Sequence, residues 1–336
     1  MSLLRKLPIR FLNPQSALRL RFFTAQTAEK HAFPDVPTSA YYDECINAAG
    51  RDGDLETIRK LLNKRIADGC FNTNNTFKFL TRTESSLSIL DDLFETLARL
   101  DRGLPRKQAY DALIARLCKI KRVEDSLRLV DAMARGNDGL NAVTFHPILS
   151  RLTHDKKMEE AWRVIGQMRQ LKVSPDLTAF NYLLTANCFN GNLMAASEVL
   201  ERIEEDQLGL DARTYDALVM GACKEGKVEG ALLLVRRMLD DGQSPLYCTY
   251  AHVISALLKL DYCAQAVKFV MVCGNRDHKL DTESFGCLAS RLIGMRKFDE
   301  AKFVLEEMNK RGLEMYGSKL KDFYESNVRN AKLNSS

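Results

Sequence analysis

The sequence predicts an all-α protein built as an α-solenoid of repeated helix-turn-helix units. Two observations carry this prediction: three series of residues recur at a spacing of 35, and apolar residues inside each repeat follow helical spacing. A period of this length sustained over much of a chain is the signature of a stacked repeat array. The composition, 46% hydrophobic and 28% charged, suits a folded chain.

The first series is aromatic. The stretch AFNYLLTANC at 179–188 returns as TYDALVMGAC at 214–223, and every step between aromatic residues is 35 except one of 33. The series is Tyr42, Phe77, Tyr110, Phe145, Phe180, Tyr215, Tyr250 and Phe285. Alanine recurs in step at Ala161, Ala196, Ala231, Ala266 and Ala301. Methionine dominates the third series, at Met133, Met168, Ile203, Met238, Cys273 and Met308.

The unit 212–246 shows how one repeat divides into elements. A first apolar face lies at helical spacing and comprises Tyr215, Leu218, Val219 and Ala222. Gly226 marks the turn, and Gly242 with Pro245 ends a second helix. The second apolar face comprises Val228, Ala231, Leu234, Val235 and Met238. Neither helix can bury its face alone, so we expect neighbouring units to stack, with sixteen helices from eight units.

The eight units cover residues 39–316. We place them at 39–73, 74–106, 107–141, 142–176, 177–211, 212–246, 247–281 and 282–316. The second unit is two residues short and Ser-rich in its middle, which predicts a local distortion of the stack. Segment 317–336 is expected to form a C-terminal cap and tail, because Leu320, Phe323 and Val328 can line a short helix.

The N-terminal segment differs in composition from the repeats. Residues 1–28 contain no Asp or Glu but five basic side chains, at Arg5, Lys6, Arg10, Arg19 and Arg21. This composition is typical of an organellar transit peptide. We predict a mitochondrial transit peptide at 1–23, followed by a linker at 24–38. The high Arg content favours the mitochondrial matrix over the chloroplast; an ordinary basic tail is the alternative.

The charge balance changes if this segment is removed. The whole chain has 49 Lys and Arg against 44 Asp and Glu, a formal net charge of +5. A product beginning at Thr24 would hold 44 of each. Bulk attraction to phosphate would then be weak, so any nucleic-acid binding must come from the local arrangement of side chains.

The remaining composition argues against a membrane span, a metal site and catalysis. No apolar run approaches the ~18–20 residues needed to cross a bilayer. The nine cysteines form no CxxC pair, which favours reduced thiols and predicts neither zinc nor a cofactor. The five histidines form no HExxH or zinc-deaminase motif, and no P-loop or GxGxxG is present, so we expect no enzyme activity.

Period and signature together resemble a known family. Units of 35 residues open on an aromatic–Asn/Asp–x–Leu pattern, and Cys223 to Ala231 reads CKEGKVEGA. These features resemble pentatricopeptide repeat proteins, of the P-class and plant-type organellar group. The tetratricopeptide repeat, of about 34 residues, has a Trp, Leu-Gly, Tyr signature that is missing here. The resemblance implies a right-handed solenoid that binds organellar single-stranded RNA at about one base per repeat.

The resemblance also implies which residues contact RNA. In the family, the residue after the aromatic and the last residue of the unit read a base. The candidate readers are Asn181 with Asp211, His146 with Asp176, Asp111 with Asn141, and Asp216, whose partner position holds Leu246. The Asn–Asp pair is the combination that favours uracil in the family.

Two further family positions imply stacking and phosphate contacts. Val143 occupies the position that sandwiches a base. Arg51, Lys119, Lys224 and Lys259 occupy the position near the inter-helix turn that meets phosphate. The series is interrupted at Ser86, His154, Phe189 and Gly294. A solvated turn is the alternative role for these basic residues.

Three functions are compatible with this pattern. The first is an organellar RNA-binding protein that acts by occupancy in RNA stability, processing, splicing or translation. The second is an architectural subunit of the mitochondrial ribosome or another ribonucleoprotein, and the third is a protein-binding scaffold. Trp162 lies on an expected second helix, where packing between units is its expected role.

Overall fold

The computed structural model describes residues 37–329, and the chain from Ser39 onward forms one compact unit. These described residues form helices and turns, with no strand. The predicted transit peptide at 1–23 lies outside them, as do most of the predicted linker and the last residues of the predicted tail. The predicted all-α solenoid is confirmed.

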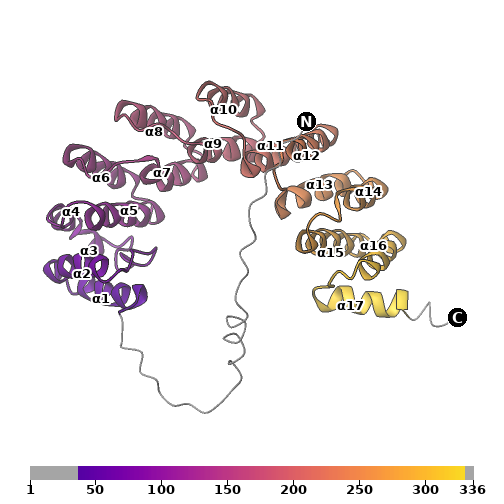
Figure 1. The fold of residues 1–336 in the computed structure, drawn as a ribbon, viewed down its shortest axis with the longest axis horizontal. Coiled ribbons are helices and arrows are strands. Elements are labelled where there is room, and N and C mark those ends of the chain that lie inside the picture. The colour runs from indigo at the N-terminus through magenta and orange to yellow at the C-terminus, as the bar shows by residue number, and fades with distance from the viewer. Residues whose placement is uncertain (1–36, 330–336) are drawn as a thin grey trace, which may run out of the picture. The chain divides into compact units, whose positions relative to one another are not determined.

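Pairs of helices follow one another along the chain (Figure 1). The pairs are α1 (Ser39–Arg51) with α2 (Leu55–Ala67), α5 (Leu104–Lys119) with α6 (Val123–Gly136), and α7 (Ala142–His154) with α8 (Met158–Gln170). They continue as α9 (Leu177–Asn190) with α10 (Leu193–Glu205), α11 (Ala212–Lys224) with α12 (Val228–Asp240), α13 (Tyr247–Lys259) with α14 (Cys263–Cys273), and α15 (His278–Gly294) with α16 (Phe298–Lys310). Helix α17 (Ser318–Tyr324) and a π-helical turn (Glu325–Arg329) follow the last pair.

First helices form the continuous row of the stack. Each of α5, α7, α9, α11, α13 and α15 contacts the next in the series. Second helices pack on their own first helix, and α6, α8, α12 and α14 also contact the first helix that follows. A side chain on one first helix is therefore held beside a side chain one repeat away in the sequence.

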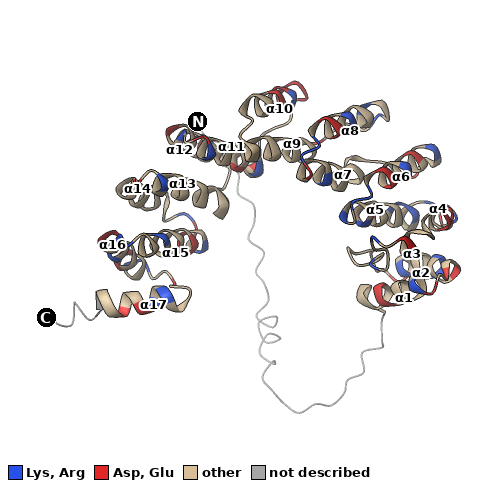
Figure 2. Cartoon of the chain, turned by 180° about the vertical axis from the view of Figure 1, so that it is seen from behind, with Lys and Arg blue, Asp and Glu red and all other residues tan. Residues whose placement is uncertain are grey.

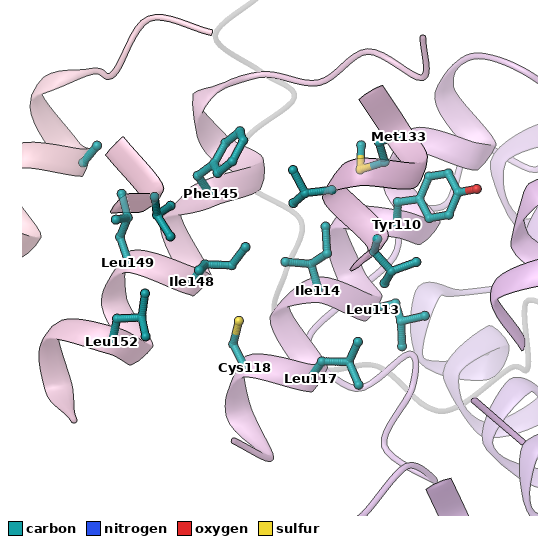
Figure 3. Close-up of a cluster of buried hydrophobic side chains, with 14 of the residues drawn as sticks. Tyr110, Leu113, Ile114, Leu117, Cys118, Met133, Phe145, Ile148, Leu149 and Leu152 are labelled. Atoms are coloured by element: carbon teal, nitrogen blue, oxygen red, sulfur yellow. The ribbon is translucent and has the colours of Figure 1, made fainter. Parts of the chain in front are cut away.

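The repeating aromatics form the centre of the core. All eight are at most 2% exposed, and the in-step alanines are buried with them. Figure 3 shows one section of the core cluster, which includes Tyr110 and Ile114 of α5 and Phe145 and Ile148 of α7. Burying one large apolar side chain contributes roughly 1.5–3 kcal/mol, so stacking stabilises helices that would be unstable alone.

The second unit (74–106) departs from the helix pairs of the other units, at the place where the sequence predicts a local distortion. Residues 74–79 are turns, followed by the four-residue α3 (Glu84–Leu87) and by α4 (Leu90–Ala98). The segment is rich in Asn, Thr and Ser, whose side chains compete with helical hydrogen bonds. Asn47 of α1 stabilises the turns by donating to the Asn75 carbonyl (2.7 Å) and accepting from the Phe79 N–H (2.6 Å).

Other elements follow the sequence more closely. Gly226 lies between α11 and α12 with φ of 71°, a left-handed conformation that suits glycine. Trp162 packs beside Phe180 of the next unit, with ring centroids 6.5 Å apart, as expected. Leu320 of α17 is buried and Phe323 is partly buried against the same cluster. Among the described residues, no helix combines the length and apolarity that a membrane span requires.

Candidate functional site

The predicted reading positions meet at the N-terminal ends of the first helices. Asn141, Asp176 and Asp211 are the N-caps of α7, α9 and α11, and each side chain accepts a hydrogen bond from a backbone N–H of the first turn. Capping satisfies N–H groups that have no partner inside a helix. The last residue of a unit is therefore fixed in place beside the preceding first helix.

Asn181 and Asp211 form the most complete pair. Asn181 Nδ2 donates to Asp211 Oδ1 at 3.1 Å, and Thr214 Oγ1 donates to Asn181 Oδ1 at 2.9 Å. Burial alone would raise the pKa of Asp211, but hydrogen bonds from Thr214 and Asn181 outweigh it and lower the pKa. The site therefore holds an ionised carboxylate beside an amide of fixed orientation.

His146 and Asp176 also meet. His146 Nε2 lies 2.8 Å and 3.0 Å from the two carboxylate oxygens of Asp176. The His146 ring lies edge-on to Tyr182, with centroids 6.0 Å apart. Tyr182 belongs to the next first helix, so an aromatic side chain adjoins this pair.

Asp111 and Asn141 are linked through other residues. Thr144 Oγ1 donates to Asp111 Oδ1 (2.9 Å), and Lys107 Nζ donates to Asp111 Oδ2 (2.5 Å). Lys107 Nζ also lies 3.4 Å from Asn141 Oδ1. In residues 37–329 no direct hydrogen bond joins Asp111 to Asn141. The Asp111 carboxylate is instead paired with the Lys107 ammonium group.

Asp216 has no polar partner at the end of its own unit. Leu246 is the N-cap residue of α13 and makes no side-chain capping bond. Thr249 Oγ1 donates to Asp216 Oδ1 at 2.8 Å, and His252 Nε2 lies 3.9 Å from the same oxygen. Asp216 is thus held by the following unit.

A recurring threonine contributes to three of these sites and to Asp43, the residue after the aromatic in the first unit. Thr76, Thr144, Thr214 and Thr249 each donate to the reading position of the preceding unit, at Asp43, Asp111, Asn181 and Asp216. The sequence spacing alone does not indicate this role. Its signal is a Thr directly before the aromatic of the repeat, and the structure reveals the partner because successive first helices pack side by side.

A groove of about 700 Å³ runs over these helices. Its walls come from α7, α9, α11 and α13 and include Asn181, Tyr182, Phe189, Arg213 and Asp216. Phe189 is 57% exposed. Val143, the predicted stacking residue, is 58% exposed on the first turn of α7 and is not among the residues lining the groove.

The four predicted phosphate-contact residues each end a first helix. Lys224 donates to the Phe189 carbonyl and lies 3.7 Å from the centroid of the Phe189 ring. Arg51, Lys119 and Lys259 are exposed and form no ion pair within the described part of the chain. Helix α9 carries no charged residue, and Figure 2 shows α9 and α13 as almost wholly uncharged.

No metal site accompanies the groove. Between residues 37 and 329, no three His, Cys, Asp or Glu side chains gather in a way that could hold a metal ion. The groove is lined by amide, carboxylate, hydroxyl, aromatic and basic side chains, and groups of these kinds contact unpaired bases in RNA-binding proteins.

Comparison with known proteins finds matches over most of the chain. Residues 92–203 match a family model described as pentatricopeptide repeat-containing protein, and residues 207–239 match the PPR repeat model. A pentatricopeptide repeat-containing protein of Arabidopsis thaliana, named as mitochondrial, is 46% identical over 98% of this chain and 95% of its own length. A second, also named mitochondrial, is 60% identical over 86% of this chain and 82% of its own length.

A solved structure shares the fold. The crystal structure of the maize pentatricopeptide repeat protein PPR10 aligns with a TM-score of 0.53 and 18% sequence identity. The alignment covers 89% of this chain and 44% of the maize chain. The repeat pattern, the stacked helix pairs and the two Arabidopsis relatives agree: the chain belongs to the pentatricopeptide repeat protein family.

Proposed function

We propose that the chain binds single-stranded RNA in the mitochondrial matrix, along the face formed by its first helices. The observation that carries the proposal is Asn181, which lines an open groove and is hydrogen-bonded to Asp211 and Thr214. The two relatives named as mitochondrial support the compartment.

The hydrogen bonds of Asn181 leave one amide N–H of its side chain available to a ligand. Oδ1 accepts from Thr214, and one Nδ2 hydrogen goes to Asp211. An amide NH₂ carries two hydrogens, so the second is open for donation. A base carbonyl such as that of uracil is the complementary acceptor, and an extruded base in a groove presents that edge.

The proposed activity requires no reaction. An RNA segment held along the groove is shielded from nucleases and from pairing with other RNA. Occupancy of this kind can serve RNA stability, processing, splicing or translation. The base-contacting groups are fixed by caps and threonines before binding, which reduces the ordering cost of association.

Crosslinking of the tagged protein in mitochondria, with sequencing of the bound RNA, tests the proposal. We expect one or a few short footprints on particular transcripts, lost in the variant Asn181→Ala with Asp211→Asn. Asn retains capping ability at position 211, so the helix end is preserved. Asn309→Ala, on an exposed position of α16, is the matched control and should leave the footprints unchanged.

A second candidate is an architectural subunit of the mitochondrial ribosome. It is favoured by the uncharged surface of α9 and by the internal contacts of Lys224, which leave few cations for selective phosphate binding. Footprints confined to ribosomal RNA and indifferent to the changes at 181 and 211 would favour it. An absence of crosslinks would contradict both and favour a protein scaffold.

A further inference from the structure

Phe189 interrupts a series of basic residues at the ends of the first helices. The corresponding positions of four other units hold Arg51, Lys119, Lys224 and Lys259. In α9 the same position presents an aromatic ring that is 57% exposed. An uncharged ring cannot pair with phosphate as a cation does, so the contact implied for the other four units is excluded here.

Lys224 of the next unit holds the Phe189 ring in place. Its ammonium group lies 3.7 Å from the ring centroid, which is the geometry of a cation–π contact. The same group donates to the Phe189 carbonyl oxygen. Phe189 lines the groove whereas Lys224 does not, so the ring separates the ammonium group from the groove. The groove side of the ring is therefore open to a ligand.

The part of the groove beside this ring is uncharged. Tyr182 lies seven residues before Phe189, about two helical turns along the same face of α9, and Thr185 and Ala186 also line the groove. Helix α9 carries no charged residue. The groove volume of about 700 Å³ lies within the range of roughly 300–1,000 Å³ that is typical of ligand pockets. A flat ring stacked on Phe189 can be accommodated.

Positive charge lines the same groove. Lys156 and Arg213 are exposed lining residues, and neither forms an ion pair within residues 37–329. Asp216, an acidic lining residue, has a side chain only 20% exposed and accepts a hydrogen bond from Thr249. The exposed charge of the groove is thus mainly positive, which favours an anionic ligand.

We propose that Phe189 stacks on one unpaired base of a single-stranded RNA and holds that base whatever its identity. This inference rests on the proposed RNA-binding function. A nucleotide joins a flat base to an anionic phosphate, so an aromatic ring near unpaired cations matches both parts. An aromatic side chain of a protein partner would match the ring but not the charge.

Stacking on Phe189 contributes affinity and not base selectivity. Every base has a π face, so contacts of this kind tolerate any sequence. The Lys224 charge on the far side of the ring offsets part of the negative potential of the π system, which reduces repulsion between stacked rings. Unit 177–211 therefore holds RNA through a base at the position where four other units carry a cation.

Titration of fluorescein-labelled single-stranded RNA of random sequence with the purified full-length chain tests the inference. Phe189→Leu keeps an apolar side chain but removes the π face. We expect this variant to bind about fivefold more weakly or worse, with a similar loss for oligo(A) and oligo(U). The slope of log affinity against log salt should stay unchanged, because stacking neutralises no phosphate.

Two further variants separate stacking from other roles. Phe189→Tyr keeps the ring and should bind RNA as tightly as the wild-type chain. Phe303→Leu on α16 alters another half-exposed phenylalanine and is the matched control, which should leave the affinity unchanged. Irradiation with RNA that carries 5-iodouridine should attach nucleotide to the peptide containing Phe189, and Phe189→Leu should lose that adduct.

The other outcomes each overturn a defined claim. If the wild-type chain binds RNA and Phe189→Leu binds it equally well, the inference is wrong and the proposed function stands. An equal loss in Phe189→Leu and Phe189→Tyr would also overturn the inference, since retention of the ring would make no difference. A loss confined to oligo(A) or to oligo(U) would contradict stacking without base preference. If the wild-type chain binds no RNA at all, the proposed function itself is overturned.

Discussion

Each of the four side chains that follow the aromatic in units 107–246 is held in place within the chain. Asp111, Asn181 and Asp216 accept from a threonine one unit further on, and His146 meets the cap residue Asp176. Side chains restrained in this way lose little rotamer freedom on binding. At the scale of single residues, contacts between neighbouring units fix these four positions, of which Asn181 and Asp216 line the groove.

The burial of two thiols predicts that they react slowly with an alkylating reagent at mildly alkaline pH. Burial raises the pKa of Cys118 and of Cys188 to about 11, above the usual value near 9. Since the thiolate is the reactive form, we expect both to resist iodoacetamide at pH 8, while the half-buried Cys45 and Cys287 react first. Mass spectrometry of alkylated peptides measures this, with urea-unfolded protein as the control. Early labelling of Cys118 in folded protein would contradict the packing.

The raised pKa values of Cys118 and Cys188 also predict how the stability of the protein changes with pH. A folded-state pKa above the unfolded value means that the unfolded chain loses its thiol protons first as pH rises. The contribution of these cysteines is therefore fully present below pH 9 and is lost between about pH 9 and pH 11.

Arg65 provides a test of the N-terminal unit. Its fully buried guanidinium donates to Asp43 Oδ1 at 2.8 Å and to the Ser39 carbonyl at 2.8 Å. Arg65→Met leaves the Asp43 charge buried and unpaired, which typically costs about 3–5 kcal/mol. We expect a clear fall in the thermal midpoint measured by circular dichroism, partly recovered by adding Asp43→Ala. Arg59→Met removes only an exposed pair with Glu56 and should have little effect; equal effects would contradict this role.

At the scale of elements, helix positions could be predicted because apolar spacing and turn glycines mark them. The pair in unit 212–246 begins and ends close to where Tyr215, Gly226 and Gly242 indicate. The distortion of the second unit could be predicted from its length and its Ser-rich middle. Its form could not, since Phe77 keeps the buried position of the series while the backbone around it forms turns. Those turns depend on Asn47, which is distant in sequence.

At two helical glycines, substitution by alanine is expected to change the stability of the protein in opposite directions. A Cβ on Gly221 of α11 would lie 3.0 Å from Cys188 Cβ and 3.1 Å from its Sγ, so α9 and α11 would have to separate slightly. A Cβ on Gly230 of α12 would meet only Lys227 Cβ, at 3.9 Å.

Alanine favours helix over glycine by about 0.5–1 kcal/mol where space allows. We therefore expect Gly230→Ala to raise the thermal unfolding midpoint and Gly221→Ala to lower it. The two variants control for each other, because both replace a helical glycine by alanine. A stabilising Gly221→Ala would show that the contact between α9 and α11 is looser than described.

At the scale of the whole molecule, the repeat period was enough to predict the solenoid. The side-chain contacts of the candidate site could be identified only from the three-dimensional structure. Sequence spacing identified Asn181 with Asp211, yet it could not show that Lys107 covers Asp111 or that Lys224 lies against Phe189. Long side chains can contact residues on neighbouring helices, and the spacing of residues in the sequence does not show which residue each of them contacts. Charged side chains of both signs are spread over the second helices (Figure 2), so the sequence alone does not show which of them pair.

The three predicted phosphate-contact residues that form no ion pair within residues 37–329 predict a shallow salt dependence of RNA binding. Each phosphate neutralised by a cation contributes about −0.7 to the slope of log affinity against log salt for single strands. With Arg51, Lys119 and Lys259 available, we expect a slope near −2, measured by fluorescence anisotropy over a salt series.

Variants of single cations sharpen this prediction. Lys119→Met should make the slope shallower by roughly 0.7. Arg163→Met, an exposed residue of α8 near Glu159, is the control and should leave the slope unchanged. A slope steeper than about −4 would show that phosphate is bound by more groups than these three.

Mapping of crosslinked peptides tests the central proposal most directly. The purified full-length chain is irradiated with single-stranded RNA, and mass spectrometry identifies the peptides that carry nucleotides. We predict adducts on α7, α9, α11 and α13, whose residues line the groove, including peptides with Tyr182 or Phe189. Adducts confined to α8, α10, α12 and α14, or no adducts at all, would contradict RNA binding on the first-helix face.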